Sequence, residues 1–468
     1  MLKIRRSIVW VLAPGLISAA TAGAQTGEGQ FGGSTSPFMG SAPPKMEVSA
    51  VPIDLSVKEA VERALQFNLG LLLQEEAVKN AHGARWRALS ELLPDISAGL
   101  ITSRQIINLA AYGFQADPSI IGPFNVYDAR VYASQPLLDL RAINDAKAAS
   151  ANERAQKLGV RTARDLVTLV AVNLYLEAVA GASRIEAARA QQDVADALYR
   201  QANDMKQAGL IAGVDVLRAQ VQLQNQRQRT IRVENEFEKS KLQLARAIGL
   251  PVGQSFTLRD KIPYAPLADV TLEGALKTAY ESRADFLAAR ERLAAAESSR
   301  RAAKSDHIPT IHLDADYGAL GQTWSEAATT FRVAANIRVP IFDAGNSTAR
   351  RIETDAELKR RQAELEDTRG RVEYDVRAAL LDLRAASQQV EAAQTNVTLA
   401  GQELEQARDR FAAGVAGNLE VTQAQQSVAI ATESYIDALY SHNLAKATLA
   451  RAVGTAEQSV MAFVGGLK

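Results

Sequence analysis

Two hydrophobic patterns alternate along this chain. Over long stretches apolar residues recur every three to four positions, as at Val376, Ala379 and Leu383, which places them on one face of a helix. Over short stretches apolar residues occupy every second position, as in residues 331–339, which is the period of a β-strand. The pattern therefore predicts long helices interrupted by short groups of strands.

The prolines lie in the strand-like stretches, in the linkers and in the N-terminal segment, and they avoid the two longest helical stretches. Residues 138–250 and 341–468 contain no proline. Because proline is excluded from helix interiors, both stretches are predicted to hold long helices. The first, from Asp139 to about Gln207, would be on the order of 100 Å long at ~1.5 Å per residue. A helix of that length suits a protein that spans an aqueous compartment.

The strands are predicted as two pairs, in about residues 94–136 and 309–342. Tyr127, Ala129 and Val131 alternate with Asp128 and Arg130, so each strand would carry an apolar face and a charged face. Each strand has about the ~9–11 residues that cross a bilayer. A sheet packed on soluble helices gives the same alternation. The isolation of these strands between polar helices favours a membrane β-barrel with its charges in a water-filled lumen.

The two halves of the chain repeat the same features in the same order. Residues 55–65 align with residues 270–280. The other matched positions are Pro94 and Pro309, Pro136 and Pro340, Asp139 and Asp343, Gly209 and Gly414, Asp215 and Glu420, and the segments 244–249 and 449–454. Each half is therefore predicted to be a helix, a strand pair, a very long helix, a glycine turn and another helix.

Each long helix is predicted to end at a glycine turn. The turns lie in QAGLIAGVDVLRAQ (residues 207–220) and AAGVAGNLEVTQAQ (residues 412–425). Gly209 and Gly414 are predicted to end their helices in the left-handed conformation. Asp215 and Glu420 would then lie in the first turn of the following helix, where a carboxylate is favourable.

At the other end of each long helix, Asp139 and Asp343 are predicted N-caps.

The N-terminus has the features of a signal peptide. Residues 1–24 combine a basic start, an apolar stretch at residues 8–17 and an A-x-A cleavage site. No later window reaches ~18 uncharged apolar residues, so no transmembrane helix is expected after the signal. The predicted organisation is then a flexible linker (25–53), a first repeat (54–250), a linker (251–269), a second repeat (270–456) and a C-terminal tail (457–468).

Composition argues against several classes of function. Without the three basic residues of the signal, 50 Lys and Arg face 53 Asp and Glu, a balance untypical of a nucleic-acid binder. The chain has no cysteine, hence no disulfide and no thiolate metal site. Its four histidines lack the spacing of a metal site. We expect no enzyme activity, no cofactor and no metal.

Four strands cannot close a membrane barrel, because the smallest such barrels have ~8. Unpaired strand edges then require several copies of the chain. Three copies would supply twelve strands, although the residues themselves do not fix the number.

Several motifs resemble one family. In VPIFDAGNSTARR (residues 339–351) a proline ends a strand and Asp-x-Gly opens a long helix. This motif, the two glycine turns and the duplicated order of elements, over residues 55–454, resemble the TolC-like outer-membrane efflux proteins. The resemblance implies a mainly α homotrimer with a small membrane β-barrel of twelve strands, continued by an α-helical barrel through the periplasm.

The resemblance also implies a function and partners. Such proteins are passive exit ducts of tripartite efflux or type I secretion systems, for drugs, small molecules or polypeptides. They are surrounded by outer-membrane lipid and work with a periplasmic adaptor (membrane fusion) protein. The adaptor connects them to an inner-membrane pump of the resistance-nodulation-division (RND), ABC or major-facilitator (MFS) type. No nucleic acid is expected.

By position, the resemblance assigns roles to individual residues. The periplasmic gate candidates are Asp215, Glu420 and Gln423. The helical tips and adaptor-docking turns hold Gly209, Leu210, Gly213, Gly414, Val415 and Gly417. The structural repeat motif consists of Pro136, Asp139, Pro340, Asp343 and Gly345. Ala416 and Gln423 stand where the family can carry a basic and a second acidic residue, so a variant charge arrangement is expected to close the duct.

Two other functions remain open from the residues alone. A periplasmic adaptor also has a long helical hairpin, but the Gly- and Val-rich lipoyl and barrel segments that it needs are missing. A secreted helical scaffold without a channel would need sustained heptads of large apolar residues and no strands of period 2.

Overall fold

The computed structural model describes residues 37–43, 48, 51–115, 117–251, 253–261, 264–266 and 270–459. The predicted signal peptide lies outside these residues, as do parts of both predicted linkers and most of the predicted C-terminal tail. The elements below all belong to the unit of residues 36–468.

Both halves of the chain fold into the same series of elements. The first half contains α1 (Val57–Phe67), α2 (Leu69–Ser90), β2 (Asp95–Asn108), β3 (Ile120–Leu138), α3 (Leu140–Gln207) and α4 (Gly213–Ala247). The second contains α5 (Leu272–Ser282), α6 (Ala284–Lys304), β5 (Thr310–Gly321), β6 (Ala328–Arg338), α7 (Asn346–Ala412) and α8 (Asn418–Val453). Matched helices differ by at most one residue in length, as for α3 with 68 residues and α7 with 67. The predicted duplication is confirmed.

The sequence pattern does not predict two features. The helix before each strand pair is divided in two, by extended backbone at Asn68 in the first half and at Arg283 in the second. A small parallel sheet of β1 (Ile53–Leu55) and β4 (Phe256–Leu258) connects the two ends of the first half. Short 3-10 turns complete the described chain: η1 (Pro37–Met39), η2 (Leu109–Tyr112) and η3 (Ser305–His307).

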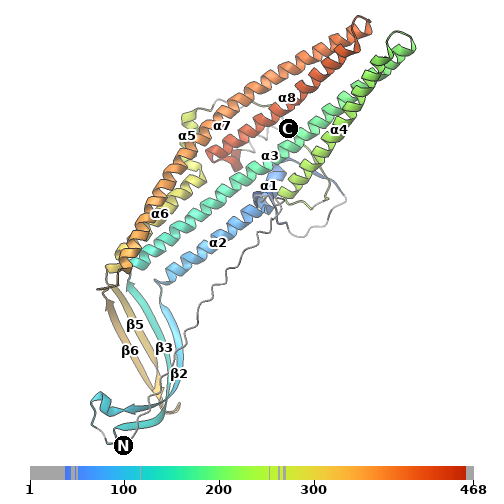
Figure 1. Ribbon diagram of the computed structural model, residues 1–468. Coiled ribbons are helices and arrows are strands. Elements are labelled where there is room, and N and C mark those ends of the chain that lie inside the picture. The colour runs from blue at the N-terminus through green and yellow to red at the C-terminus, as the bar shows by residue number, and fades with distance from the viewer. Residues whose placement is uncertain are drawn as a thin grey trace, which may run out of the picture. The chain divides into compact units, whose positions relative to one another are not determined.

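The four long strands form one antiparallel sheet in the order β2-β3-β5-β6 (Figure 1). The pairing of β3 with β5 joins the two halves of the chain, with Tyr132 opposite Asp316. Pro136 lies inside β3 rather than at its end. The ladder with β2 stops at Ser134, so the missing N–H of Pro136 removes no hydrogen bond on that side. Pro340 follows β6, which ends at Arg338.

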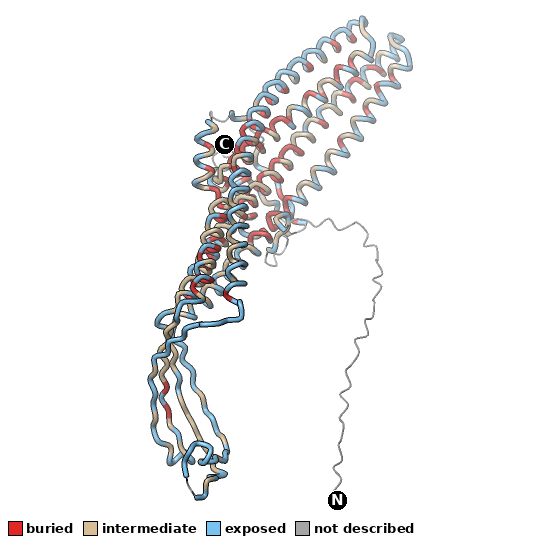
Figure 2. Tube along the Cα trace, turned by 60° about the vertical axis from the view of Figure 1, so that its left-hand side comes forward, coloured by how far each residue is buried: buried red, intermediate tan, exposed pale blue. Residues whose placement is uncertain are grey.

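Helix α3 lies at the centre of the helical part and packs against α2, α4, α6 and α8. Its buried positions are rich in alanine, including Ala142, Ala171 and Ala178, and small side chains let helices approach closely. Figure 2 shows the buried positions along the helices, whereas the strands are mostly exposed. By length and composition α3 could also cross a membrane, but 61% of its apolar window is buried inside the protein, as expected of a core helix.

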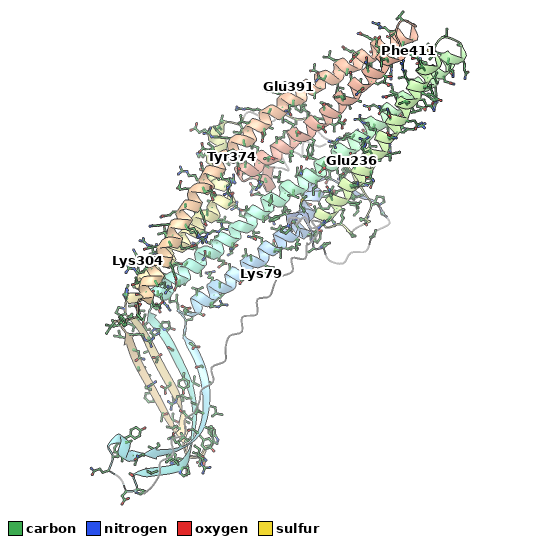
Figure 3. The ribbon with its side chains drawn as sticks, viewed as in Figure 1. Lys79, Glu236, Lys304, Tyr374, Glu391 and Phe411 are labelled. Carbon is green, nitrogen blue, oxygen red and sulfur yellow. The ribbon has the colours of Figure 1, made fainter. Side chains whose placement is uncertain are left out.

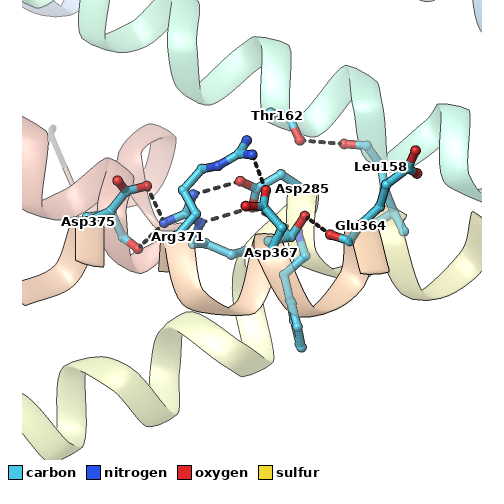
Figure 4. Close-up of polar contacts among 11 residues, drawn as sticks. Leu158, Thr162, Asp285, Glu364, Asp367, Arg371 and Asp375 are labelled. Carbon is cyan, nitrogen blue, oxygen red and sulfur yellow. Dashed lines mark hydrogen bonds and ion pairs between the residues drawn. The ribbon is translucent and has the colours of Figure 1, made fainter. Parts of the chain in front are cut away.

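A buried arginine joins α5 and α6 to α7 and α8. The Arg283 guanidinium donates to Asp285 (Nη2–Oδ2 2.7 Å), to Asp375 of α7 (Nη1–Oδ2 2.9 Å) and to the Ala452 carbonyl of α8 (3.4 Å). Figure 4 shows Asp285 and Asp375 beside a further ion pair of α7, Asp367 with Arg371. The charge of Arg283 is therefore compensated at the point where the helix is divided.

A buried histidine in α8 makes the stability of the fold depend on pH. His442 is fully buried against Tyr264, with ring centroids 5.2 Å apart. Burial, and then the charge of Lys446, lowers the pKa of His442 to about 4 from an ordinary value of 6.5. As the pH falls, the unfolded chain therefore binds the proton first. The contribution of His442 to stability is complete above pH 6.5 and is lost as the pH falls toward 4.

We expect the unfolding temperature to fall between pH 6.5 and pH 4, by the equivalent of about 3 kcal/mol per chain at most. Circular-dichroism melts of the purified protein at pH 7.5, 5.5 and 4.5 measure this dependence. Because carboxylates also titrate in this range, the comparison is with His442→Leu, whose pH dependence should be shallower. If the unfolding temperatures of the two proteins depend equally on pH, His442 is not the cause of the pH dependence.

Candidate functional site: the strand sheet and the helical tips

One face of the four-stranded sheet is apolar and uncovered. Within the described chain no helix lies over this face, and Phe331 is 75% and Val333 65% exposed (Figures 1 and 2). The face is formed by Ile96, Ala98, Leu100, Tyr127, Ala129, Val131, Ala133, Leu313, Ala315, Tyr317, Phe331, Val333, Ala335 and Ile337, as the alternation and the strand register require. An apolar surface of this extent marks contact with lipid or with another protein.

The opposite face of the sheet carries a network of charges. Arg130 of β3 pairs with Asp128 (3.3 Å) and with Asp316 of β5, and it donates to the Thr330 hydroxyl of β6 (2.9 Å). Arg332 of β6 pairs with the other oxygen of Asp316 (3.1 Å). Asp314 accepts hydrogen bonds from Ser134 (2.6 Å) and Asn336. The predicted separation into an apolar and a charged face is confirmed, and the ion pairs hold three strands in register.

The outer edges of β2 and β6 have no strand partner within the described chain. In hydrocarbon each unpaired backbone group costs several kcal/mol, so an open edge cannot persist there. Because the strands alternate in direction, β6 of one copy would lie antiparallel to β2 of the next. Both outer edges therefore present unpaired backbone groups to which a further strand could add.

At the far end of the long helices, the two glycine turns have the same geometry. Gly209 and Gly414 adopt left-handed φ angles of 72° and 73°. The backbone N–H groups of Leu210 and Val415 each donate to the carbonyl five residues earlier, at 2.8 and 3.0 Å. This is the Schellman arrangement, which closes a helix end with glycine. The predicted role of both glycines as helix terminators is confirmed.

Apolar side chains project from these turns into solvent. Leu210 is 70% and Val415 69% exposed, and Leu217 and Leu419 are exposed in the following helices. Gly213 begins α4, and Gly417 is the N-cap of α8. Below the turns a cluster of Leu198, Phe411, Val421 and Ala424 joins the two hairpins, and Figure 3 labels Phe411 close to the α7–α8 turn. The tips therefore present apolar groups on a well-packed support.

The two predicted gate carboxylates are both paired. Asp215 and Glu420 each occupy the third residue of their helix, as predicted. Asp215 Oδ1 lies 3.3 Å from Arg218 Nη1 of the same helix. Glu420 Oε1 lies 3.3 Å from Arg410 Nε, which belongs to the last turn of α7. The Arg410–Glu420 pair therefore crosses the turn and connects α7 to α8.

Arg410 is a residue that the sequence reasoning missed. Arg410 could have been noticed from the sequence, because it lies in the last turn of a predicted helix, where a positive charge is favourable. Gln423 is exposed one turn beyond Glu420 in α8, and Ala416 lies in the turn. Asp215 and Glu420 lie in the first turns of α4 and α8, and Gln423 lies in the second turn of α8. Figure 1 shows that α4 and α8 both begin at the same end of the helical part.

The two aspartates at the starts of the long helices differ. Asp139 is the N-cap of α3, and its Oδ1 accepts a hydrogen bond from the Ala142 N–H (2.9 Å), as predicted. The prediction for Asp343 is wrong, because Gly345 with φ of 90° is the N-cap of α7. Asp343 accepts from the N–H groups of Gly345 (3.1 Å) and Ser347 (2.7 Å). The left-handed Gly345 delays the helix start, and the carboxylate still reaches its first turn.

The described residues contain no group of three or more His, Asp or Glu side chains that could hold a metal ion. The site is instead a large surface with two parts, the sheet at one end of the long helices and the turns at the other.

Known proteins share this sequence pattern and this fold. Residues 275–455 match a family model described as outer membrane efflux protein. The outer membrane protein TolC of Vibrio cholerae is 26% identical over 315 residues, 66% of this chain and 72% of that protein. The pyoverdine export outer membrane protein OpmQ of Pseudomonas aeruginosa is 26% identical over 415 residues, 85% of each. The crystal structure of the outer membrane protein VceC of Vibrio cholerae, 18% identical, superposes with a TM-score of 0.73 over 85% of this chain and 96% of that one.

Proposed function

Because this chain belongs to the TolC-like outer-membrane efflux proteins, we propose that it is the outer-membrane exit duct of a tripartite efflux or type I secretion system. Its transport is passive, and the cargo is a drug, another small molecule or a polypeptide. The observation that carries this function is the four-stranded sheet, with an exposed apolar face on one side and paired charges on the other. Such a sheet suits a wall between lipid and water.

The proposed duct is a homotrimer. Three copies of the four-stranded sheet supply a barrel of twelve strands, within the range of known membrane barrels. Each β6 edge pairs with the β2 edge of the next copy, the apolar face contacts outer-membrane lipid, and the charged face lines the lumen. The long helices continue the duct into the periplasm for on the order of 100 Å. The two repeats, 54–250 and 270–456, contribute equivalent walls.

The proposed partners meet the duct at its helical tips. A periplasmic adaptor binds Leu210 and Val415, the exposed apolar side chains of the two tips. Binding removes these side chains from contact with water. The adaptor connects the duct to an inner-membrane pump of the RND, ABC or MFS type, which supplies the energy.

The proposed gate lies at the same tips. In a trimer Glu420 forms a ring of three carboxylates, which favours cations at a narrow point. The Arg410–Glu420 pair compensates this charge in the present conformation and holds α7 to α8. Asp215 and Gln423 line the same opening. Ala416 and Gln423 stand where the family can carry a basic and an acidic residue. In this chain the Arg410–Glu420 pair supplies these two charges instead.

We expect Glu420→Gln to reduce the preference of the channel for cations and its block by divalent cations. Loss of one carboxylate per chain removes about 1 kcal/mol of attraction for a nearby cation, which is about fivefold in the permeability ratio. Reversal potentials in a salt gradient across a planar bilayer measure the change. Glu403→Gln, at an exposed position of α7, is the matched control. If Glu420→Gln and Glu403→Gln give the same reversal potential, Glu420 is not part of the gate.

The same recordings test the function itself. Purified full-length protein added to a planar bilayer should produce stable conductance steps. A periplasmic adaptor or a secreted scaffold, the two competing functions, would produce none.

A further inference from the structure

A cavity of about 200 Å³, open to solvent on one side, lies between the two hairpins of the helical part. Its lining comes from all four long helices: Ala187, Ala190, Gln191 and Val194 of α3, Gln226 of α4, Leu404 of α7, and Gln425, Val428 and Thr432 of α8. An engineered cavity of ~150 Å³ accommodates benzene, so this space is large enough for a small organic molecule.

The walls of the cavity are mostly apolar, and its polar lining groups are uncharged. No acidic or basic side chain lines it, and Ala187 and Ala190 leave the space that larger residues would fill. Toward the turns it is bounded by the cluster that contains Leu198 and Phe411. On the other side, two ion pairs join α8 to the first hairpin, Arg229–Glu433 (2.5 Å) and Arg184–Asp437 (2.6 Å). An occupant of this cavity is therefore uncharged, because no counterion faces it.

Three amide groups in the lining have unused hydrogen-bonding capacity. The side-chain carbonyls of Gln191 and Gln226 and the side-chain N–H₂ of Gln425 are buried without a partner in the described part of the chain. Gln425 is only 8% exposed. Each such group costs about 1–3 kcal/mol if it stays unpaired. Two acceptors and one donor in an apolar space therefore specify a ligand with two N–H groups and one carbonyl.

The repeat shows that this buried amide is a specific feature of the second hairpin. Gln220 occupies the position in α4 that Gln425 occupies in α8, and Gln220 is exposed. The cavity opens to solvent beside Ala190, which is exposed, so a small molecule can enter it.

We propose that this cavity binds a small uncharged molecule with a flat apolar body and a carboxamide or urea edge. Its N–H groups donate to the carbonyls of Gln191 and Gln226, and its carbonyl accepts from Gln425. Its apolar body contacts Val194 and Leu404. Because the walls come from both hairpins, the bound molecule connects α3 and α4 to α7 and α8. The proposal concerns the wall of the duct and does not depend on which cargo passes through it.

Benzamide and benzoate form a matched pair of probes, since they share a shape but only benzamide is neutral and has N–H groups. We expect benzamide to bind the purified full-length protein saturably, with one site per chain, in saturation-transfer NMR and calorimetry. Benzoate should bind at least tenfold more weakly. Equal binding of the two probes, or no saturable binding of benzamide, would overturn the proposal and leave water as the occupant.

Two variants and one control locate the site. Gln425→Leu removes the donor and should weaken benzamide binding at least tenfold. Gln220→Leu, at the exposed matched position, is the control and should leave benzamide binding unchanged. Ala190→Leu fills the cavity and should also abolish binding. Circular dichroism checks that each variant is folded. If folded Gln425→Leu and Ala190→Leu both bind benzamide like the wild-type protein, the ligand lies elsewhere and the proposal is wrong.

Discussion

Arginine in place of Val333 is expected to prevent assembly of the protein in the outer membrane. Val333 lies on the apolar face of β6, opposite Ala315 of β5, and is 65% exposed in a single chain. If this face contacts lipid, an arginine near the middle of the bilayer costs about 2–4 kcal/mol per chain, and every copy in the oligomer carries it. We expect the heat-sensitive oligomer to disappear from outer-membrane extracts run on a gel without boiling.

The matched control is arginine at the next residue. Ala334 points to the charged face and lies opposite Asp314, so an arginine there gains a carboxylate neighbour and reaches water. Ala334→Arg should assemble like the wild-type protein. If both variants assemble, or if both fail, the apolar face does not contact lipid in the way proposed.

Aspartate at both Leu210 and Val415 is expected to abolish export while leaving the channel intact. These side chains are the exposed apolar groups of the two tips, and their turns are closed by backbone hydrogen bonds that the substitution does not touch. A charge there must lose its water when an adaptor covers the tip, which disfavours docking. We expect export by cells that carry the double variant to fall at least tenfold, to the level of cells without the protein.

Two measurements separate docking from folding in that experiment. The double variant should keep its conductance in planar bilayers and its heat-sensitive oligomer. Leu73→Asp, at an exposed leucine of α2 away from the tips, should support normal export. Normal export by the double variant would contradict docking at these residues, and loss of the oligomer would mean that the tips serve assembly instead.

Periodicity and helix breakers predict a large part of this fold because they act locally. The proline-free stretches, the strands of period 2 and the glycines at 209 and 414 each reflect the conformation of their own segment. The duplicated order then extends a prediction from one half to the other. For the same reason the sheet and the tips, the two parts of the site, could be located from the sequence.

The remaining features depend on contacts between distant residues. The pairing of β3 with β5, the Arg410–Glu420 pair and the cavity around Gln425 all depend on which faces of different elements meet. The two helix breaks could not be predicted either, because no proline or glycine marks them. Their extended residues, Asn68 and Arg283, are held by side-chain contacts with distant residues. At Asp343 the motif correctly predicts a helix start, but Gly345, with its positive φ, is the N-cap instead of Asp343.

Several copies of this chain are expected to close one duct, and the mass of the complex tests this expectation most directly. Native mass spectrometry of the protein extracted from outer membranes in mild detergent counts the copies without labels or variants. We expect three chains per complex, which gives twelve strands from the four-stranded sheet of each. A monomer, or a mixture without a defined copy number, would contradict a closed barrel and with it the proposed duct.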